Sequence, residues 1–362
     1  MDLIIYSHFN RHQVNVFTGK IVDENTGIPE HSAPQLTEYL TAHSRKYSKI
    51  TIVMINSAVS QTQLFTSARF RFIVIKKRRR SIITLFGPER NDLDEFSLRP
   101  TSNYDISVHW LSNVILVDPY IFSSARLVHI QLHDVPTDMI IALRSKYLSS
   151  ILGLIKLWRR RRDIKKLVVT TVTDKNLGKF LLMKPTLLYN CIPGDLPKNT
   201  KKQFDICVFL SEAKFKGKSE FFKFITKYTS SKLNICIVGI KGNQNDTGHH
   251  HLNYYQNIDH KTAIQLISDS KVLLHFSKFE ALPSPVIEAR AVGIPVFCPK
   301  YVTISRLYQN DPFVNFLDQH SSADLNRQIK QFLNPPIMSK FVPPELTFSH
   351  FKKQISDIYQ YE

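Results

Sequence analysis

Cysteine is scarce in this sequence, and the few cysteines form no recognisable motif. The 362 residues contain four, at Cys191, Cys207, Cys236 and Cys298. They are too few and too scattered for a disulfide framework or for a zinc site built from paired cysteines. Three of the four lie in apolar runs, so we expect buried thiols in a reducing compartment.

Long hydrophobic stretches are missing as well. No segment approaches the roughly 18 uninterrupted apolar residues that a membrane-spanning helix needs. The opening letters MDLIIYSHFNRH lack the basic leader and the apolar core of about 7–15 residues that define a secretory signal. We therefore expect a cytoplasmic protein that meets a membrane, if at all, peripherally at the inner face.

Acidic residues are outnumbered by basic ones. Thirty Asp and Glu residues stand against 48 Lys and Arg residues, which gives a formal net charge of +18 at pH 7. This excess favours an anionic partner, which could be nucleic acid, anionic lipid or a phosphorylated substrate. We find no nucleic-acid-binding motif, Walker loop or nucleophile elbow, so we expect no nucleic-acid partner. Nucleic-acid binding driven by the basic runs alone stays open as an alternative.

Short apolar and β-branched runs alternate with helical patterns along the chain. Continuous apolar character in such runs is typical of parallel strands that helices cover on both faces. At about 150 residues per domain the length suggests two domains, so the sequence predicts an α/β protein with two of them. The runs expected to be strands are residues 3–6, 50–55, 72–75, 82–86, 114–117, 127–132, 167–172, 186–189, 205–210, 235–240, 272–275 and 295–297.

A polar, lysine-rich stretch with two prolines and a glycine separates the two halves at residues 190–202. Such punctuation is typical of a linker. We expect one domain over residues 1–190 and a second over residues 191–345. The closing residues 346–362 have the apolar spacing of an amphipathic helix, which could leave the second domain and pack elsewhere.

The most informative segment is LHFSKFEALPSPVIEARAVGIPVFCPK, residues 274–300. Glu280 stands just beyond the end of a buried strand, and Glu288 lies about one turn into a helix that begins near Pro285. Ligands bind outside the carboxyl ends of parallel strands, where a helix N-terminus suits a phosphate and carboxylates can accept from sugar hydroxyls. The plainer alternative is that Glu288 complements the helix dipole and Glu280 is a solvated loop charge.

This segment resembles the donor-site signature of the retaining glycosyltransferases of family 4. The resemblance implies the GT-B fold, in which two Rossmann-like domains face each other across a cleft and a C-terminal helix crosses back to the first domain. Arg290 stands where the family usually has Met, and we expect it at the surface. The matching residues are Ser277, Glu280, Ala281, Leu282, Pro283, Ser284, Glu288, Ala289, Ala291, Gly293, Pro295 and Val296.

The resemblance assigns roles to this segment. Glu288 would bind the nucleotide ribose, and Glu280 would hold hydroxyls of the donor sugar. The donor would also lie along Leu282, Pro283 and Ser284, with backbone N–H groups around Leu282 nearby.

A second part of the resemblance begins at residue 205. The family has a strand that leads to an Arg and, five residues on, a Lys-Gly, and both basic groups bind the donor diphosphate. The lysine is present as Lys216, whose plainer interpretation is a solvated lysine at a helix start. Ser211 occupies the arginine position, so one cation is missing or is supplied by Lys214 or Lys218. Gly239 falls in the turn that lies beneath the nucleotide in the family.

The first half resembles the family more loosely. Residues 127–136 are similar to the strand whose final His-Asp faces the donor sugar, which would place His133 across the cleft from Glu280. A purely structural role for His133 stays open. The family has two glycines in the loop after its first strand, whereas the first glycine here is Gly19, so the acceptor loop must be built differently.

Two other clusters carry charge or metal-binding residue types. The Leu, Ile and Trp residues of 140–166 accompany a basic run, as in a helix that lies on an anionic bilayer, although a solvated cationic helix face explains the same pattern. Three adjacent histidines at residues 249–251 cannot all face one metal ion. We expect them in a solvated loop, and we expect no metal site.

From the resemblance we expect a retaining, metal-independent glycosyltransferase that needs no further cofactor. It would move a sugar from a nucleotide-diphosphate donor to a glycan or lipid-linked acceptor, in cell-surface polysaccharide or lipopolysaccharide synthesis. Lys216 would neutralise the charge that forms on the leaving diphosphate. The alternative is a catalytically silent GT-B relative that binds an anionic surface or partner.

Overall fold

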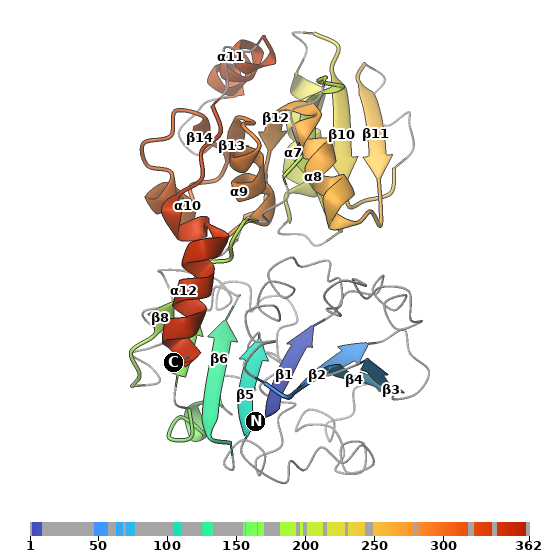
Figure 1. The fold of residues 1–362 in the computed structure, drawn as a ribbon. Coiled ribbons are helices and arrows are strands. Elements are labelled where there is room, and N and C mark those ends of the chain that lie inside the picture. The colour runs from blue at the N-terminus through green and yellow to red at the C-terminus, as the bar shows by residue number, and fades with distance from the viewer. Residues whose placement is uncertain are drawn as a thin grey trace. The chain divides into compact units, whose positions relative to one another are not determined.

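The chain forms two compact units in the computed structural model (Figure 1). The first comprises Met1–Tyr189 with Phe351–Glu362, and the second comprises Asn190–His350. The structure describes residues 2–8, 47–56, 63–67, 70–76, 104–109, 125–132, 155, 157–164, 166–169, 182–192, 196–197, 201–212, 216–228, 231–242, 249–278, 280, 282–317, 322–334 and 339–359.

The first unit is built on an eight-stranded sheet of order β3-β4-β2-β1-β5-β6-β7-β8. Neighbouring strands are parallel, except that β3 runs antiparallel to β4. The central strands are lined by fully buried aliphatic residues, as expected for a sheet covered on both faces. The strands are β1 (Asp2–His8), β2 (Lys49–Asn56), β3 (Gln63–Ser67), β4 (Phe70–Lys76), β5 (Tyr104–His109), β6 (Leu127–Leu132), β7 (Lys166–Val169) and β8 (Thr186–Leu187).

One buried carboxylate ties this sheet together at the start of β5. Asp105 is fully buried. It accepts hydrogen bonds from the Tyr47 hydroxyl at 2.7 Å and from the Arg126 guanidinium at 3.1 and 2.6 Å. Because a buried charge is tolerated only when it is paired and hydrogen-bonded, these partners account for an aspartate inside the strand.

The second unit contains a six-stranded, entirely parallel sheet of order β11-β10-β9-β12-β13-β14. Its strands are β9 (Phe204–Phe209), β10 (Asn234–Val238), β11 (His251–Tyr255), β12 (Ser270–Leu274), β13 (Val296–Cys298) and β14 (Val314–Phe316). Its helices are α7 (Lys218–Lys227), α8 (His260–Ser268), α9 (Ser284–Ala291), α10 (Val302–Leu307), α11 (Ser322–Leu333) and the 3-10 helix η7 (Pro344–Leu346).

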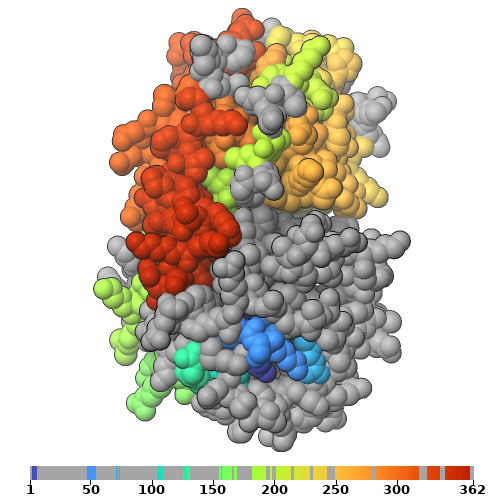
Figure 2. Space-filling view, viewed as in Figure 1, coloured from blue at the N-terminus to red at the C-terminus, as the bar shows by residue number. Residues whose placement is uncertain are grey.

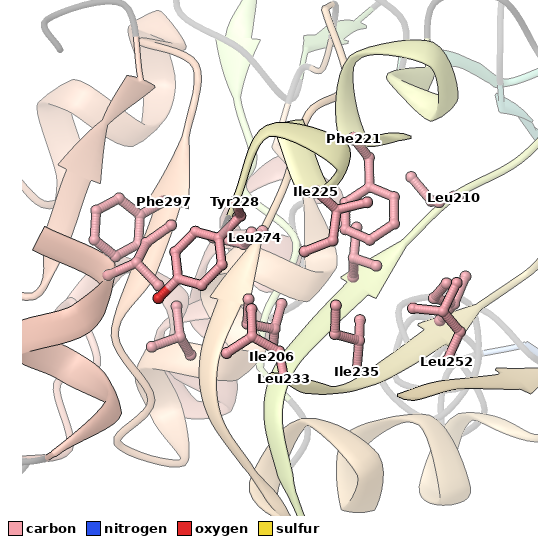
Figure 3. Packing of buried hydrophobic residues seen from close by; sticks show 14 of the residues in the cluster. Ile206, Leu210, Phe221, Ile225, Tyr228, Leu233, Ile235, Leu252, Leu274 and Phe297 are labelled. Carbon is pink, nitrogen blue, oxygen red and sulfur yellow. The ribbon is translucent and has the colours of Figure 1, made fainter. Parts of the chain in front are cut away.

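Helices cover both faces of this second sheet. On one face, Phe221 and Ile225 of α7 pack against strand residues such as Ile206 and Leu274, and α11 contributes to the same cluster (Figure 3). The alternate residues of the strands, including Cys207, Cys236 and Leu273, point to the other face, where α8 contacts β12 and α9 contacts β13. The expected buried thiols are confirmed, since all four cysteines are free and buried.

The last helix, α12 (Phe348–Tyr359), belongs from Phe351 onward to the first unit. Phe351, Ile355 and Ile358 are buried, and the Gln354 side-chain amide donates to the carbonyl of Leu187 in β8 at 3.3 Å. The red residues of this helix lie at the surface in Figure 2, where its polar side meets solvent. In the part of the chain that the structure describes, no helix is long and apolar enough to cross a membrane.

Most of the expected strands are found at or near their predicted positions. Two of them, at residues 82–86 and 114–117, lie outside the described residues. The sequence analysis did not find β3, β5 and β14. Their segments are short or carry polar residues, such as Asp105 and Ser107 in β5, that break a continuous apolar run.

The prediction that Arg290 lies at the surface is wrong. Its side chain is 0% exposed and pairs with the Asp311 carboxylate, with Nε to Oδ2 at 2.7 Å. The guanidinium also donates to the carbonyls of Ile294 and Ser339, both at 3.1 Å, and stacks over the Phe313 ring at 5.0 Å. A planar group with five donors can satisfy all of these partners at once, so Arg290 joins α9 to the segments that follow it.

We expect Asp311→Ala to lower the free energy of unfolding by about 3–5 kcal/mol, because it leaves a buried guanidinium without its counter-ion. Urea denaturation measures this loss. Asp324→Ala is the control, since Asp324 pairs with Arg327 at 2.9 Å on the exposed face of α11 and such pairs contribute little. Equal stabilities of the two variants would contradict the structural role of the buried pair.

Candidate donor site

The topology of the second sheet marks a place for a ligand. From β9 the order runs outward through β10 and β11, and on its other side through β12, β13 and β14. The strand order therefore reverses between β9 and β12. In open parallel sheets, ligands bind outside the carboxyl ends of the strands at such a reversal. Lys216 follows β9 and Glu280 follows β12, so both belong to this end of the sheet.

Gly217 brings these two segments together. It caps α7 with φ of +76°, a left-handed conformation that favours glycine. A Cβ atom built there would lie 2.3 Å from the carbonyl oxygen of Phe276, which is closer than real Cβ atoms come. The Lys-Gly pair thus needs its glycine for the backbone to pass close to the end of β12.

Lys216 and Glu280 are brought together as a result. The Lys216 ammonium donates to Glu280 Oε1. Their side chains keep 34% and 18% of their surface exposed, so the pair is partly buried but open to solvent. An opening of this kind allows an anionic or polyhydroxyl ligand to reach both groups.

A third side chain, His275, lies behind this pair. It directly follows β12, and its Nε2 is 3.8 Å from Glu280 Oε1. Burial lowers the pKa of His275 to about 4, against the opposing charge of Glu280 and with the added repulsion of Lys216. The imidazole is therefore neutral at pH 7. Its ring packs edge-on at 6.0 Å from Tyr301, whose hydroxyl donates to the Ser277 carbonyl.

The second carboxylate, Glu288, is almost completely buried. It lies beyond the first turn of α9, and its side chain is 4% exposed. His260 at the start of α8 lies with Nε2 2.9 Å from Glu288 Oε1. That helix is capped by Asp259, which accepts from the Thr262 N–H at 2.6 Å and so fixes where His260 stands. The simpler alternative, that Glu288 complements the helix dipole from the first turn, does not fit its position beyond that turn.

The loop between the two carboxylates is held in place by its prolines. Leu282 and Pro283 are buried, and Pro283 precedes α9 with extended backbone, while Ser284 opens the helix. A proline in the first turn is tolerated because the N–H it lacks has no intrahelical partner. These residues start α9 at a defined point after Glu280.

Of the two expected substitutes for the missing arginine, Lys218 is the one that the structure describes, and no described contact joins it to Lys216. Lys218 donates to both oxygens of Glu212, at 2.8 and 2.9 Å, on the surface. Lys214 lies outside the described residues. Ser211 follows the end of β9 and is half-buried, so it occupies the expected position with an uncharged side chain.

Gly239 forms a tight turn at the end of β10. Its φ is +105°, and a Cβ atom there would lie 2.3 Å from the carbonyl oxygen of Leu210. Its N–H donates to the Tyr255 carbonyl at 2.8 Å. The turn therefore crosses close to the end of β9, beside Ser211.

Other predicted residues fall elsewhere. His133 and Gly19 lie outside the described residues. The expectation of a solvated loop at residues 249–251 is wrong for His250, which is buried and lies with Nε2 3.2 and 3.1 Å from the carbonyls of Ile225 and Tyr228. Its Nδ1 accepts from the Leu233 N–H at 3.3 Å, so it joins the end of α7 to the sheet. Within the described residues no cluster of His, Cys, Asp and Glu could hold a metal ion.

Sequence reasoning assigned no role to His260 and did not single out His275. His260 opens α8, and its contact with Glu288 of α9 gives it a place in the site. His275 ends an apolar run, where a buried histidine gives a weak signal.

Comparisons with known proteins agree with this geometry. Residues 197–340 match the model of the family Glycosyl transferases group 1. Sucrose-phosphate synthase from Thermosynechococcus elongatus is similar over 99% of this chain and 95% of its own, with a TM-score of 0.64 and 11% identity. The fold is GT-B. The prediction of an α/β GT-B architecture is thereby confirmed.

Two further solved structures are similar over the whole chain. The trehalose-6-phosphate protein from E. coli, bound with UDP-2-fluoro glucose, covers 100% of both chains with a TM-score of 0.58 and 12% identity. A trehalose-6-phosphate synthase studied with bisubstrate glycomimetics for glycosyltransfer with retention covers 99% of both, with a TM-score of 0.57 and 12% identity. No curated protein matches the chain. The family match together with the fold supports a glycosyltransferase.

We expect Gly217→Ala to lower the free energy of unfolding by more than about 1 kcal/mol, because alanine is strained at positive φ and its Cβ would overlap Phe276. Chemical denaturation gives the value. Ser219→Ala, at an exposed position of α7, is the control and should change stability by less than about 0.5 kcal/mol. If Gly217→Ala were as stable as this control, the close approach would not exist.

Proposed function

We propose that this protein is a retaining, metal-independent glycosyltransferase that takes its sugar from a nucleotide-diphosphate donor and needs no further cofactor. The observation that carries the proposal is the pairing of Lys216 with Glu280 at the point where the strand order of the second sheet reverses. A cation and a carboxylate held at that edge suit the two halves of such a donor, its phosphates and its sugar hydroxyls.

Lys216 would stabilise the leaving group. When the bond between sugar and diphosphate breaks, negative charge develops on the phosphate oxygens. A fixed cation at that place lowers the barrier without a metal ion. The ammonium of Lys216 is one-third exposed, so it can turn from Glu280 to a bound phosphate. Ser211, Lys218 and Gly239 would border the phosphates and nucleotide from the ends of β9 and β10.

The two carboxylates would hold the rest of the donor. His260 engages Glu288 Oε1, which leaves Oε2 to accept from the ribose hydroxyls. Glu280 would accept from hydroxyls of the sugar. The backbone N–H groups of Leu282 and Ser284 would lie nearby, whereas Pro283 has no N–H. Retention is supported by the similarity to a synthase studied for that outcome.

The acceptor we propose is a glycan or lipid-linked saccharide of cell-surface polysaccharide or lipopolysaccharide synthesis. Its support is a surface turn of the first unit, where Ile155 and Trp158 are 46% and 44% exposed. Arg159 and Arg162 are exposed beside them, and the Arg161 guanidinium lies 4.5 Å from the centre of the Trp158 ring. Apolar and cationic groups side by side suit an anionic bilayer, where lipid-linked saccharides are found.

A catalytically silent GT-B relative is the second candidate. Ser211 in place of a guanidinium, and Lys218 held by Glu212, favour it. Such a protein would keep the fold and bind an anionic surface or partner without moving a sugar. Titration with UDP- and GDP-sugars separates the two functions, because only the enzyme binds a donor.

We expect Glu288→Gln to reduce sugar transfer at least about a hundredfold while the protein stays folded. The neutral amide loses the charge that strengthens the bonds to the ribose, and its single oxygen cannot serve both His260 and the ribose. A mass-spectrometric screen of UDP- and GDP-sugars first identifies the donor, and circular dichroism checks the fold. Glu345→Gln, on η7, is the matched control. Unchanged transfer by Glu288→Gln would refute the assignment, and an empty donor site would favour the silent relative.

We expect the protein to sediment with vesicles of phosphatidylglycerol but not with vesicles of phosphatidylcholine. Reversing the charge at Arg159 and Arg162 together (R159E, R162E) should weaken this binding more than tenfold, at about 1 kcal/mol for each cation removed from the surface. Reversal at exposed Lys232 and Lys330 of the second unit is the control with the same change in net charge. Equal losses in both double variants would assign the binding to overall charge instead.

A further inference from the structure

His275 is a buried polar side chain whose ring nitrogens have no hydrogen-bond partner in the part of the chain that the structure describes. The residue is 4% exposed, and neither Nδ1 nor Nε2 meets a donor or acceptor among the described residues. Only its backbone is engaged, with the N–H donating to the Phe297 carbonyl at 2.8 Å. Buried polar groups are nearly always hydrogen-bonded, so an orphan imidazole requires an explanation.

Packing alone does not explain this histidine. It continues the apolar run of β12, in a position lined by the buried sheet on one side and by Tyr301 on the other. A leucine of similar volume would fill the space without burying two unsatisfied nitrogens. The imidazole therefore lowers the stability of the free protein, as polar groups held ready at a ligand site do.

A carboxylate oxygen of the candidate site lies just beyond hydrogen-bond reach of the ring. Nε2 lies 3.8 Å from Glu280 Oε1, less than 1 Å beyond the usual range of a hydrogen bond. That same oxygen accepts from Lys216. The two donors, the Lys216 ammonium and the His275 imidazole, thus approach one carboxylate oxygen, and in this structure the ammonium holds it.

The protonation state suits a neutral donor. Glu280 and Lys216 are the charged groups that act on the ring. Burial, with added repulsion from Lys216, outweighs the attraction of Glu280 and lowers the pKa of His275 to about 4. The ring therefore stays neutral from pH 7 down to nearly pH 4, and it has one N–H to donate. A neutral ring adds no charge that would compete with Lys216 for phosphate.

We propose that His275 is a positioning residue that takes over Glu280 Oε1 when Lys216 turns to a bound phosphate. This inference rests on the proposed function, in which Lys216 serves the leaving group and Glu280 the sugar. Glu280 is four-fifths buried. When Lys216 moves away, the Glu280 carboxylate would lose both this hydrogen-bond donor and its orientation. A hydrogen bond from Nε2–H keeps it directed at the sugar hydroxyls.

The first test needs no donor. Lys216→Met removes the competing ammonium, and we expect the Nε2–H of His275 to become a hydrogen-bonded, slowly exchanging proton in ¹H–¹⁵N NMR spectra at pH 7.5. The wild-type protein and the double variant K216M, E280A should lack that signal, because the wild-type protein keeps the bond from the lysine and the double variant has no side-chain oxygen at position 280 to accept. Absence of the signal in Lys216→Met would overturn the inference.

The second test uses UDP-glucose as the probe. In the wild-type protein, saturation with UDP-glucose should produce the same Nε2–H signal that Lys216→Met produces alone. Binding without the signal would overturn the inference. Failure of UDP- and GDP-sugars to bind would instead count against the proposed function, and the Lys216→Met spectrum would still decide the role of His275.

Substitution of the ring separates positioning from packing. We expect His275→Leu to raise the Tm, because it removes the orphan nitrogens, and to lower kcat about tenfold with little change in donor KM. His275→Gln, which keeps an N–H donor, should recover part of kcat. A fall in Tm together with unchanged kcat in His275→Leu would assign the residue to the core and overturn the proposal.

Discussion

The close approach of Gly217 to Phe276 is the constraint on which the candidate site depends. It brings the segment after β9 against the segment after β12, at the place where the strand order reverses. Within the described second sheet, this is where two neighbouring parallel strands send their connections in opposite directions and leave room at their carboxyl ends. Lys216 precedes the glycine and Glu280 follows the strand, so the ion pair is a consequence of the backbone contact.

The two carboxylates of the site differ because their surroundings differ. Glu280 keeps 18% of its side-chain surface exposed and accepts from a lysine, whereas Glu288 is only 4% exposed on α9 and is held by His260 from α8. A buried carboxylate that is held by one hydrogen-bond partner is fixed in direction. It suits a part of the ligand that always binds in one way, such as a ribose. A partly exposed carboxylate with a movable partner suits the part of a ligand that changes during a reaction.

Much of the fold and the core of the site could be predicted from the sequence. Apolar runs such as residues 205–210 and 235–240 predicted parallel strands. The position of Glu280 after such a run, and of Glu288 in the next helix, predicted that they lie at the carboxyl edge of the sheet, and the resemblance added Lys216. The contact of His260 could not be predicted, because its partner Glu288 is distant in the chain. The contact of His275 could not be predicted, because that residue only ends an apolar run. Arg290 was misplaced because its partner Asp311 is set by the path of the chain after α9.

The replacement of the expected arginine by Ser211 changes what the site requires of Lys216 and Glu280. With Ser211 uncharged and Lys218 held by Glu212, Lys216 is the cation that the described contacts place at the Glu280 carboxylate. While Lys216 is paired with that carboxylate, the pair presents no net charge to an approaching diphosphate. The positive charge becomes available when the ion pair opens. Opening of the ion pair leaves the largely buried carboxylate of Glu280 without its donor. The free-energy cost of opening falls if a neighbouring group can donate to that carboxylate instead of Lys216. With Lys216 as the one cation that the described residues bring to Glu280, the site has more need of a neutral donor behind that carboxylate than a site with two.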